Sequence, residues 1–206
     1  MTLLQKLREE YGENTPIATG EISFKNYSRP WINKELNRLC KEKKLVRYEK
    51  GIYYIPSETL LGQSVLNPRK VIEKKYIRNS GGIIGYYSGY TMLNQLKLSQ
   101  QTSGVIELYT NNASANVREV NVGGQRVLTR KARVTVTDEN APVLCFFEIM
   151  NFLPPAMLDG EKKKILRDYI VSHGITRSDI TKYSPYFPDN AMRTLIESEV
   201  IYSVTQ

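Results

Sequence analysis

The pattern of apolar and polar positions divides the first quarter of the chain into three helical stretches followed by two strands. Leucines at helical spacing predict a first helix from Thr2 to Tyr11. A second, short helix is expected around Ala18 to Phe24. Leu45 to Tyr48 and Ile52 to Ile55 have the aromatic and β-branched composition of strands, and Gly51 between them can supply the positive φ of a tight turn.

The third helical stretch, residues 28–42, predicts a helix with two different faces. Ser28 is a favourable N-cap, and Pro30 fits the first turn, where a missing N–H costs nothing. Three apolar side chains fall in one narrow stripe at 100° per residue: Ile32, Leu36 and Leu39. Four polar side chains fall on the opposite side: Lys34, Asn37, Arg38 and Lys41. The sequence therefore predicts one face for a core and one cationic face.

Helix, short helix, capped helix and hairpin, in this order, are the elements of a winged helix-turn-helix module. Pro56 and Ser57 would end it, which predicts a DNA-binding domain over residues 1–57. Residues 58–206 carry strands, turns and apolar helices of their own, enough for a second domain. The expected fold class is α+β: an N-terminal winged helix-turn-helix, then a mixed α+β domain with a helical C-terminal extension.

The second domain is predicted to begin with helices and to continue with strands. One helix is expected at 68–78, and another follows the glycine-rich start at 81–85. Four strands are expected next, at residues 105–110, 119–122, 126–129 and 132–137. Four helices complete the chain, at residues 141–152, 161–172, 177–183 and 189–199.

Basic residues concentrate in one part of this 206-residue chain, whose formal net charge is +8. Between Lys25 and Lys50 the sequence holds nine cations against three glutamates, so this segment alone carries +6. A cluster of this density is the electrostatic footprint of an element that binds a polyanion. Double-stranded DNA is the expected partner, and no cofactor or metal is implied.

Nine residues are the candidate DNA contacts: Ser28, Arg29, Asn33, Lys34, Asn37, Arg38, Lys41, Arg47 and Lys50. In a winged module this helix enters the major groove, where Arg and Asn pair with base edges and Lys neutralises phosphate. The hairpin residues would then lie near the flanking backbone or the minor groove, and the helix start near a phosphate. A solvated helix surface is the alternative interpretation, because surface helices commonly carry lysines. Trp31 either donates its indole N–H to a phosphate or packs against the hairpin.

Other candidate sites favour structural interpretations. Gly81, Gly82 and Gly85 match neither common nucleotide-binding glycine motif and indicate close backbone packing at a helix start. Three nearby tyrosines fit base stacking, core packing or a protein interface: Tyr86, Tyr87 and Tyr90. The only histidine, His173, stands at an expected helix C-terminus, and no catalytic set can be assembled around it from the sequence.

The Glu-x-Lys sequences that start at Glu42, Glu73 and Glu161 lie in charged helical runs, which favours helix surface over a metal-dependent nuclease site. Cys40 and Cys145 are expected to be reduced, partly buried thiols without a metal. Neither an apolar leader nor a stretch long enough to cross a bilayer is present, which predicts a cytoplasmic protein with no membrane partner.

Several stretches resemble a known family: INKELNRLCKEKKLVRYEKGIYYIP, GGIIGYYSGYTMLNQLKLSQQTSGVIELYTN, NVGGQRVLTRKA and LCFFEIMNFL. Over residues 1 to 153 the chain resembles the AbiEi-type antitoxin and transcriptional regulator proteins, particularly a compact branch of them. The most specific pieces are the hairpin from Arg47 to Pro56 and the helix from Ser88 to Ser99. The chain departs from the common pattern in carrying more lysine in LCKEKKLVRYEKG.

This resemblance implies a winged domain that binds promoter DNA and a second domain that counters a nucleotidyltransferase-like toxin. The first hypothesis is thus a non-enzymatic DNA-binding transcriptional regulator, the antitoxin of a toxin–antitoxin or phage-defence system. The second is an accessory interaction protein of a DNA-processing system, whose basic module only tethers it to nucleic acid. A nuclease is the third. The resemblance gives no role to residues 154–206.

Overall fold

The computed structural model describes residues 2–25, 27–60, 62–101 and 103–204 of the chain. Its fold is mixed α+β, as the sequence predicts, with eight α-helices and several small sheets in these residues. The chain divides into two compact units, which are residues 1–75 and residues 76–206. Each unit has a hydrophobic core of its own.

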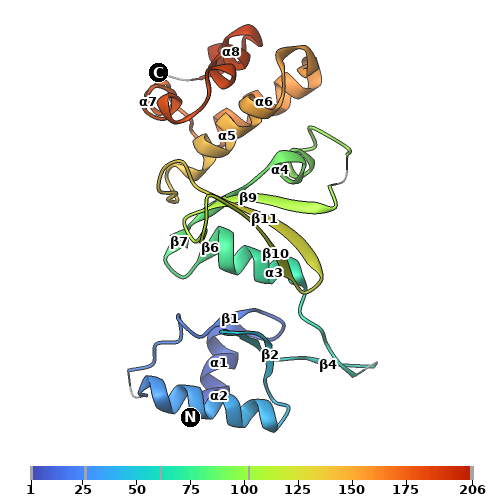
Figure 1. The fold of residues 1–206 in the computed structure, drawn as a ribbon, viewed down its shortest axis with the longest axis vertical. Helices are drawn as coiled ribbons and strands as arrows, with labels where there is room; N and C mark the ends of the chain where they lie inside the picture. The colour runs from blue at the N-terminus through green and yellow to red at the C-terminus, as the bar shows by residue number, and fades with distance from the viewer. Residues whose placement is uncertain (1, 26, 61, 102, 205–206) are drawn as a thin grey trace. The chain divides into compact units, whose positions relative to one another are not determined.

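The first unit combines three α-helices with short strands (Figure 1). In chain order its elements are α1 (Leu3–Tyr11), β1 (Ile17–Ala18), α2 (Arg29–Lys41), β2 (Val46–Glu49), β3 (Ile52–Tyr54), β4 (Glu58–Thr59), β5 (Gly62–Gln63) and α3 (Pro68–Ile72). A π-helix, Glu73–Ile77, continues directly from α3. The predicted first and third helices and both hairpin strands are thereby confirmed, with boundaries shifted by one or two residues.

The core of the first unit lies between the two long helices and a three-stranded sheet. The sheet is antiparallel, in the order β1-β3-β2, with Ile17 opposite Tyr53. Its core residues come from both helices, the sheet and the loops: Leu3, Leu7, Ile17, Ile22, Ile32, Leu36, Leu39, Leu45, Tyr53 and Ile55. The apolar stripe predicted for α2 is therefore its buried face.

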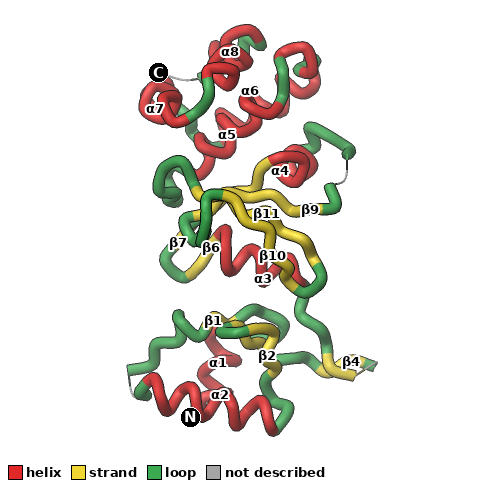
Figure 2. The backbone as a smooth tube through the Cα atoms, in the orientation of Figure 1, coloured by secondary structure: helices red, strands yellow, loops and turns green. Residues whose placement is uncertain are grey.

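The prediction of a short helix around residues 18–24 is wrong. Ile17 and Ala18 form β1, and turns and loop occupy the described residues that follow, up to the start of α2 (Figure 2). Thr19 donates its backbone N–H to the carbonyl of Gly51 at 2.9 Å, next to the β1–β3 pairing. This pairing joins residues more than thirty positions apart and outweighs the weak local helical preference.

Residues 58–75 belong to the first unit, so the division in the structure lies beyond the boundary expected at residue 57. The Asn14 side chain bonds both Ser57 and Ser64, and Lys70 donates to the Asn14 carbonyl at 2.9 Å. Near the end of the unit, Lys75 pairs with Glu49 at 2.6 Å. These contacts connect the segment after the hairpin to the loop after α1 and to β2.

In its described residues the second unit contains a four-stranded sheet, a two-stranded sheet of β6 and β7, and five α-helices (Figure 1). Its strands are β6 (Arg78–Asn79), β7 (Gly82–Ile83), β8 (Gly85–Ser88), β9 (Val105–Thr110), β10 (Val117–Val122) and β11 (Gln125–Lys131). Its α-helices are α4 (Gly89–Gln95), α5 (Ala141–Phe152), α6 (Gly160–Ser172), α7 (Arg177–Tyr183) and α8 (Asp189–Glu197). Short 3₁₀ turns lie at Pro155–Met157, Ser184–Tyr186 and Val200–Ser203.

The sheet of the second unit has the order β10-β11-β9-β8, with β9 and β11 parallel and the other pairs antiparallel. Helix α5 is its central core element, because Phe146, Phe147, Ile149 and Met150 are fully buried. It contacts β8, α4, α7 and α8. Five of the predicted helices and three of the predicted strands are confirmed here.

The prediction of a fourth strand at residues 132–137 is wrong. The backbone of Val136 bonds the side-chain amide of Asn111 in both directions, at 2.8 and 2.9 Å, instead of a neighbouring strand. The residue after Val136 is also bonded by a side chain, because the Asn140 amide oxygen accepts the backbone N–H of Thr137 at 2.8 Å. Two smaller differences from the prediction lie earlier in the chain. Arg78, the last residue of the helix predicted at 68–78, begins strand β6, and the glycine-rich segment before α4 forms strands β7 and β8.

Candidate nucleic-acid interface

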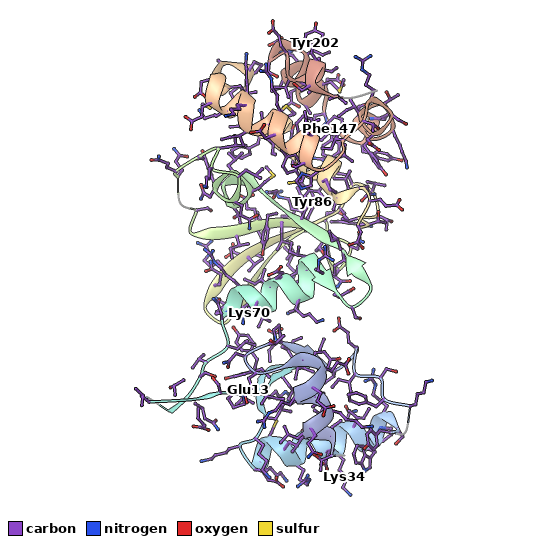
Figure 3. The ribbon with its side chains drawn as sticks, turned by 180° about the vertical axis from the view of Figure 1, so that it is seen from behind. Glu13, Lys34, Lys70, Tyr86, Phe147 and Tyr202 are labelled. Atoms are coloured by element: carbon purple, nitrogen blue, oxygen red, sulfur yellow. The ribbon has the colours of Figure 1, made fainter. Side chains whose placement is uncertain are left out.

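Helix α2 carries most of the candidate contacts, and its local sequence explains where it begins. The Ser28 hydroxyl accepts the N–H of Trp31 as N-cap, and Pro30 lies in the first turn. Ile32, Leu36 and Leu39 are almost fully buried, so the helix is fixed by its apolar face. The opposite face is presented outward, and Figure 3 shows Lys34 extending from the side of α2 away from α1.

The outward face of α2 holds two lysines and two asparagines with exposed side chains: Asn33, Lys34, Asn37 and Lys41. Within the described part of the chain, neither Lys34 nor Lys41 has an ion-pair partner within 4 Å. At helical spacing these side chains lie on adjacent turns, so they form one patch. The patch offers two positive charges and two amides, which can both donate and accept hydrogen bonds.

Arg38 lies beside this patch but is held by two carboxylates of its own helix. Its Nε donates to Glu35 Oε2 at 2.9 Å, Nη2 donates to the other Glu35 oxygen, and Nη1 donates to Glu42. Glu42 also accepts from Lys44 at 2.9 Å. The hydrogen bond from Arg38 lowers the pKa of Glu35, and the bond from Lys44, with Arg38, lowers the pKa of Glu42. Arg38 is therefore a positioned cation, unlike the two lysines beside it.

The start of α2 is anchored to the turn that replaces the predicted short helix. Arg29 donates Nη1 to the carbonyls of Thr19 and Ile22, the latter at 3.2 Å, and Nη2 to the carbonyl of Gly20 at 3.2 Å. These bonds satisfy backbone carbonyls that a helix would have paired internally. The guanidinium thus stabilises the entry to α2. Within the described residues the Ser28 O–H donates no hydrogen bond, so it remains able to donate.

Trp31 belongs to a row of aromatic rings beside the helix start. Its indole stacks on Tyr27, with ring centroids 4.2 Å apart and planes 12° from parallel. Phe24 meets Tyr27 edge to face at 6.3 Å, and Lys6 Nζ lies 4.6 Å from the Tyr27 centroid. Trp31 is 39% exposed, and the contact of its ring is with Tyr27 rather than the expected hairpin.

The hairpin supplies the last two candidate cations. Arg47 on β2 and Lys50 in the turn are exposed, and neither has an ion-pair partner among the described residues. Gly51 has φ +82°, as its turn position requires, and its carbonyl accepts from Thr19. Glu49 pairs with Lys75, so one side of the turn is tied to the residues after α3.

The structure thus brings four candidate contacts of α2 together in one patch. The other two cations of the helix have protein partners: Arg29 bonds backbone carbonyls, and Arg38 bonds two glutamates. Sequence reasoning missed the roles of Glu35 and Glu42, although their spacing of three and four residues from Arg38 is the signal for such pairs. It also missed Lys43, exposed at φ +57° where α2 ends. Glycine usually takes such a position.

The remaining candidates lie in structural settings. A Cβ on Gly85 would come within 2.1 Å of the Tyr76 carbonyl oxygen, so the predicted close backbone packing is present at Gly85, although Gly85 begins strand β8 rather than a helix. Tyr86 is buried and stacks on Tyr109 at 5.5 Å, while Tyr90 meets Phe152 edge to face. His173 is the C-cap of α6, and its Nδ1 lies 2.9 Å from the Tyr169 carbonyl oxygen.

Both cysteines are free thiols, and burial raises the pKa of Cys145 to about 12. Over residues 2–25, 27–60, 62–101 and 103–204, no three His, Cys, Asp or Glu side chains are grouped as metal ligands. Among the helices of those same ranges, none has both the length and the apolar composition that crossing a bilayer requires.

Residues 21–144 match the model of DUF6088, described as a family of unknown function. The match begins before α2 and ends within α5, so it spans the cationic patch, the hairpin and the whole four-stranded sheet. It covers more than half of the chain and leaves α6, α7 and α8 outside. A search of curated proteins found no match.

Proposed function

The chain belongs to the DUF6088 family, and we propose that it is a non-enzymatic transcriptional regulator that binds double-stranded DNA through its first unit. One observation carries the proposal: the outward face of α2 presents Lys34, Asn37 and Lys41 to solvent, opposite a fully buried apolar stripe. Lysines without carboxylate partners are available to phosphates, and a flanking amide is available to a base edge.

The arrangement of the first unit supports a winged-helix interpretation. Helix α1, strand β1, helix α2 and the β2–β3 hairpin follow one another, and β1 closes the sheet beside β3. In such modules the helix before the hairpin enters the major groove. The unit departs from the pattern between β1 and α2, where a turn anchored by Arg29 stands in place of a helix.

Eight of the nine candidate residues, all except Arg38, then have a role set by their environment. Lys34 and Lys41 neutralise phosphates, Asn33 and Asn37 face base edges, and the Ser28 hydroxyl donates to a phosphate at the helix start. Two further cations, Arg47 and Lys50, contact the backbone beside the groove. Arg29 holds the loop that positions the helix.

A binding titration tests the proposal. The full chain is titrated, without added metal, against the DNA immediately upstream of its own coding sequence and against a shuffled duplex of equal length and composition. A regulator binds the upstream duplex more tightly, and both affinities fall with salt. Equal weak binding to both duplexes contradicts a regulator. Cleavage of the duplex on addition of Mg²⁺ would identify a nuclease instead.

We also propose that the second unit binds a partner protein, a nucleotidyltransferase-like toxin in the antitoxin hypothesis. Support comes from the resemblance to AbiEi-type proteins and from a surface cavity of about 770 Å³ in this unit. Tyr90, Phe152 and Met157 line it with Lys97 and Lys162, and Met157 is 58% exposed. Such a cavity can receive an apolar side chain of a partner.

The same cavity supports the accessory-protein alternative, in which the partner belongs to a DNA-processing system. Co-expression with the product of the neighbouring gene separates the two. Rescue of growth from a toxic neighbour, together with co-purification, supports the antitoxin. A neighbour that co-purifies without any toxicity of its own supports the accessory protein.

A further inference from the structure

Arg38 is presented on α2 in a fixed orientation with part of its hydrogen-bonding capacity unused. A guanidinium carries five N–H donors: one on Nε and two on each terminal nitrogen. Glu35 takes the Nε–H and one Nη2–H, and Glu42 takes one Nη1–H. One N–H therefore remains on each terminal nitrogen. Two donors in the guanidinium plane are left, one on each terminal nitrogen, on a side chain that is 53% exposed.

The two carboxylates lie on one side of Arg38, and the cationic patch lies on the other. At 100° per residue, Lys34 stands about 40° from Arg38 in one direction, and Glu42 stands about 40° from it in the opposite direction. Glu35 lies beyond Arg38 on the same side as Glu42, toward the buried stripe, and its side chain is only 18% exposed. The glutamates thus support Arg38 from behind and leave its outer edge toward the patch.

This arrangement fits a base edge better than a phosphate. Glu35, Arg38 and Glu42 together carry a formal charge of −1, and Lys44 only brings the group to zero. Such a group has little attraction for a polyanion. Lys34 and Lys41, which have no ion-pair partner among the described residues, attract it strongly. An exposed ion pair also adds little to folding stability, so stability alone does not account for a guanidinium held at three points. Donors on the two terminal nitrogens of one guanidinium match the O6 and N7 acceptors of guanine in the major groove.

We propose that Arg38 reads one guanine of the DNA site, and that Glu35 and Glu42 are positioning residues that hold its guanidinium for that contact. The inference rests on the proposed DNA binding through α2. It adds a base preference at a single position and two acidic residues that sharpen the preference while opposing general attraction to DNA.

The first experiment uses the full chain and duplexes enriched from a pool with a randomised 20-base-pair core. Each guanine of the enriched duplex is replaced in turn by 7-deazaguanine, which lacks only the N7 acceptor. At one position the wild-type affinity should fall about tenfold, as expected for the loss of one charge-assisted hydrogen bond. Exchanging that G·C pair for A·T should cost roughly 5- to 150-fold. Arg38→Ala, which removes the guanidinium donors, should bind guanine and 7-deazaguanine duplexes equally.

The second experiment tests the glutamates with the double variant Glu35→Gln/Glu42→Gln. Removing two negative charges should raise its affinity for a random duplex, while its discrimination against 7-deazaguanine should fall severalfold toward that of Arg38→Ala. A matched control, Glu9→Gln/Glu10→Gln on exposed positions of α1, makes the same change in charge and should leave the discrimination intact. A purely structural role of the glutamates predicts no opposite movement of affinity and discrimination.

The outcomes separate the two proposals. A chain that binds no duplex overturns the proposed function, and the guanine contact with it. An enriched duplex whose 7-deazaguanine forms all bind like the parent overturns the guanine contact and leaves DNA binding in place. Discrimination that is unchanged in Glu35→Gln/Glu42→Gln overturns the positioning role. The whole inference is supported by a single sensitive guanine, whose discrimination is lost in Arg38→Ala and weakened in the glutamine variant.

Discussion

Replacing Lys34 and Lys41 together by alanine removes the two exposed cations at the centre of the α2 patch. Both side chains lie opposite the buried stripe, and within the described ranges neither has an ion-pair partner, so no packing is lost. Alanine also has the higher helix propensity, which favours α2 by a few tenths of a kcal/mol per position. The variant should therefore unfold in urea at the same concentration as the wild type or slightly above it.

The expected effect on DNA binding follows from counterion release. Each phosphate contact contributes about 0.9 to the slope of log affinity against log salt, so two lost contacts should reduce that slope by about 1.8. Between 50 and 200 mM salt the affinity ratio of wild type to variant should then shrink by roughly twelvefold. Fluorescence anisotropy with a labelled 30-base-pair duplex of random sequence, measured at several salt concentrations, gives both slopes.

A matched variant controls for net charge. Lys164→Ala/Arg167→Ala removes the same charge from exposed positions of α6 in the second unit and should leave the slope unchanged. A folded Lys34→Ala/Lys41→Ala protein with the wild-type slope would refute the assignment of α2 as the DNA-contacting helix. An equal decrease in the control would show that the slope reports total charge rather than contacts.

Three predictions concern the two cores. Leu36→Ala, in the almost fully buried stripe of α2, should lower the free energy of unfolding by about 2–5 kcal/mol in urea titrations and should weaken DNA binding only through unfolding. Gly85→Ala would place a Cβ 2.1 and 2.5 Å from two backbone carbonyl oxygens and should cost about 3 kcal/mol or more, whereas Gly104→Ala, with no atom within 4 Å, should cost little. Burial raises the pKa of Glu148 despite the lowering effect of Arg133, so the folded state binds the proton more tightly than the unfolded state. The stability that this group contributes is therefore present below the unfolded pKa and is lost as pH rises through the folded pKa. In urea titrations from pH 4.5 to 7, the free energy of unfolding of Glu148→Gln should rise relative to that of the wild type. A difference between the two proteins that stays constant with pH would contradict the raised pKa.

The elements predicted correctly from sequence are those with local signals. Helix α2 has a cap, a proline in the first turn and a single apolar stripe, and all three lie within its own residues. Strands β10 and β11 are joined by the Gly123-Gly124 turn, and their alternating pattern is enough to place them. The cationic face of α2 could be predicted for the same reason, since helical periodicity alone determines which side chains lie opposite the core.

Elements set by distant partners could not be predicted. Strand β1 exists because Ile17 pairs with Tyr53, and the coil near Val136 exists because the Asn111 side chain occupies its backbone groups. The extent of the first unit depends on bonds from Asn14 to residues some fifty positions later. No local pattern carries this information, because it arises from which segments meet after folding.

The candidate site shows the same division. Exposure of Lys34 and Lys41 followed from periodicity, and the pairing of Arg38 with Glu35 and Glu42 could have been found from their spacing. The bonds of Arg29 to backbone carbonyls could not be predicted, because these carbonyls belong to a turn that stands in place of a predicted helix. Its guanidinium is thereby directed to the backbone of its own unit.

Amide chemical-shift mapping of the full chain against a 20-base-pair duplex tests the central claim most directly. The account predicts that the largest shifts fall on the α2 residues around Lys34, Asn37 and Lys41 and on the hairpin near Lys50, and that added salt reverses them. Residues of α6, α7 and α8 should remain unperturbed by the DNA. Shifts confined to the second unit, or no shifts in α2 at duplex concentrations that saturate binding, would contradict the assignment of α2 as the DNA-binding helix.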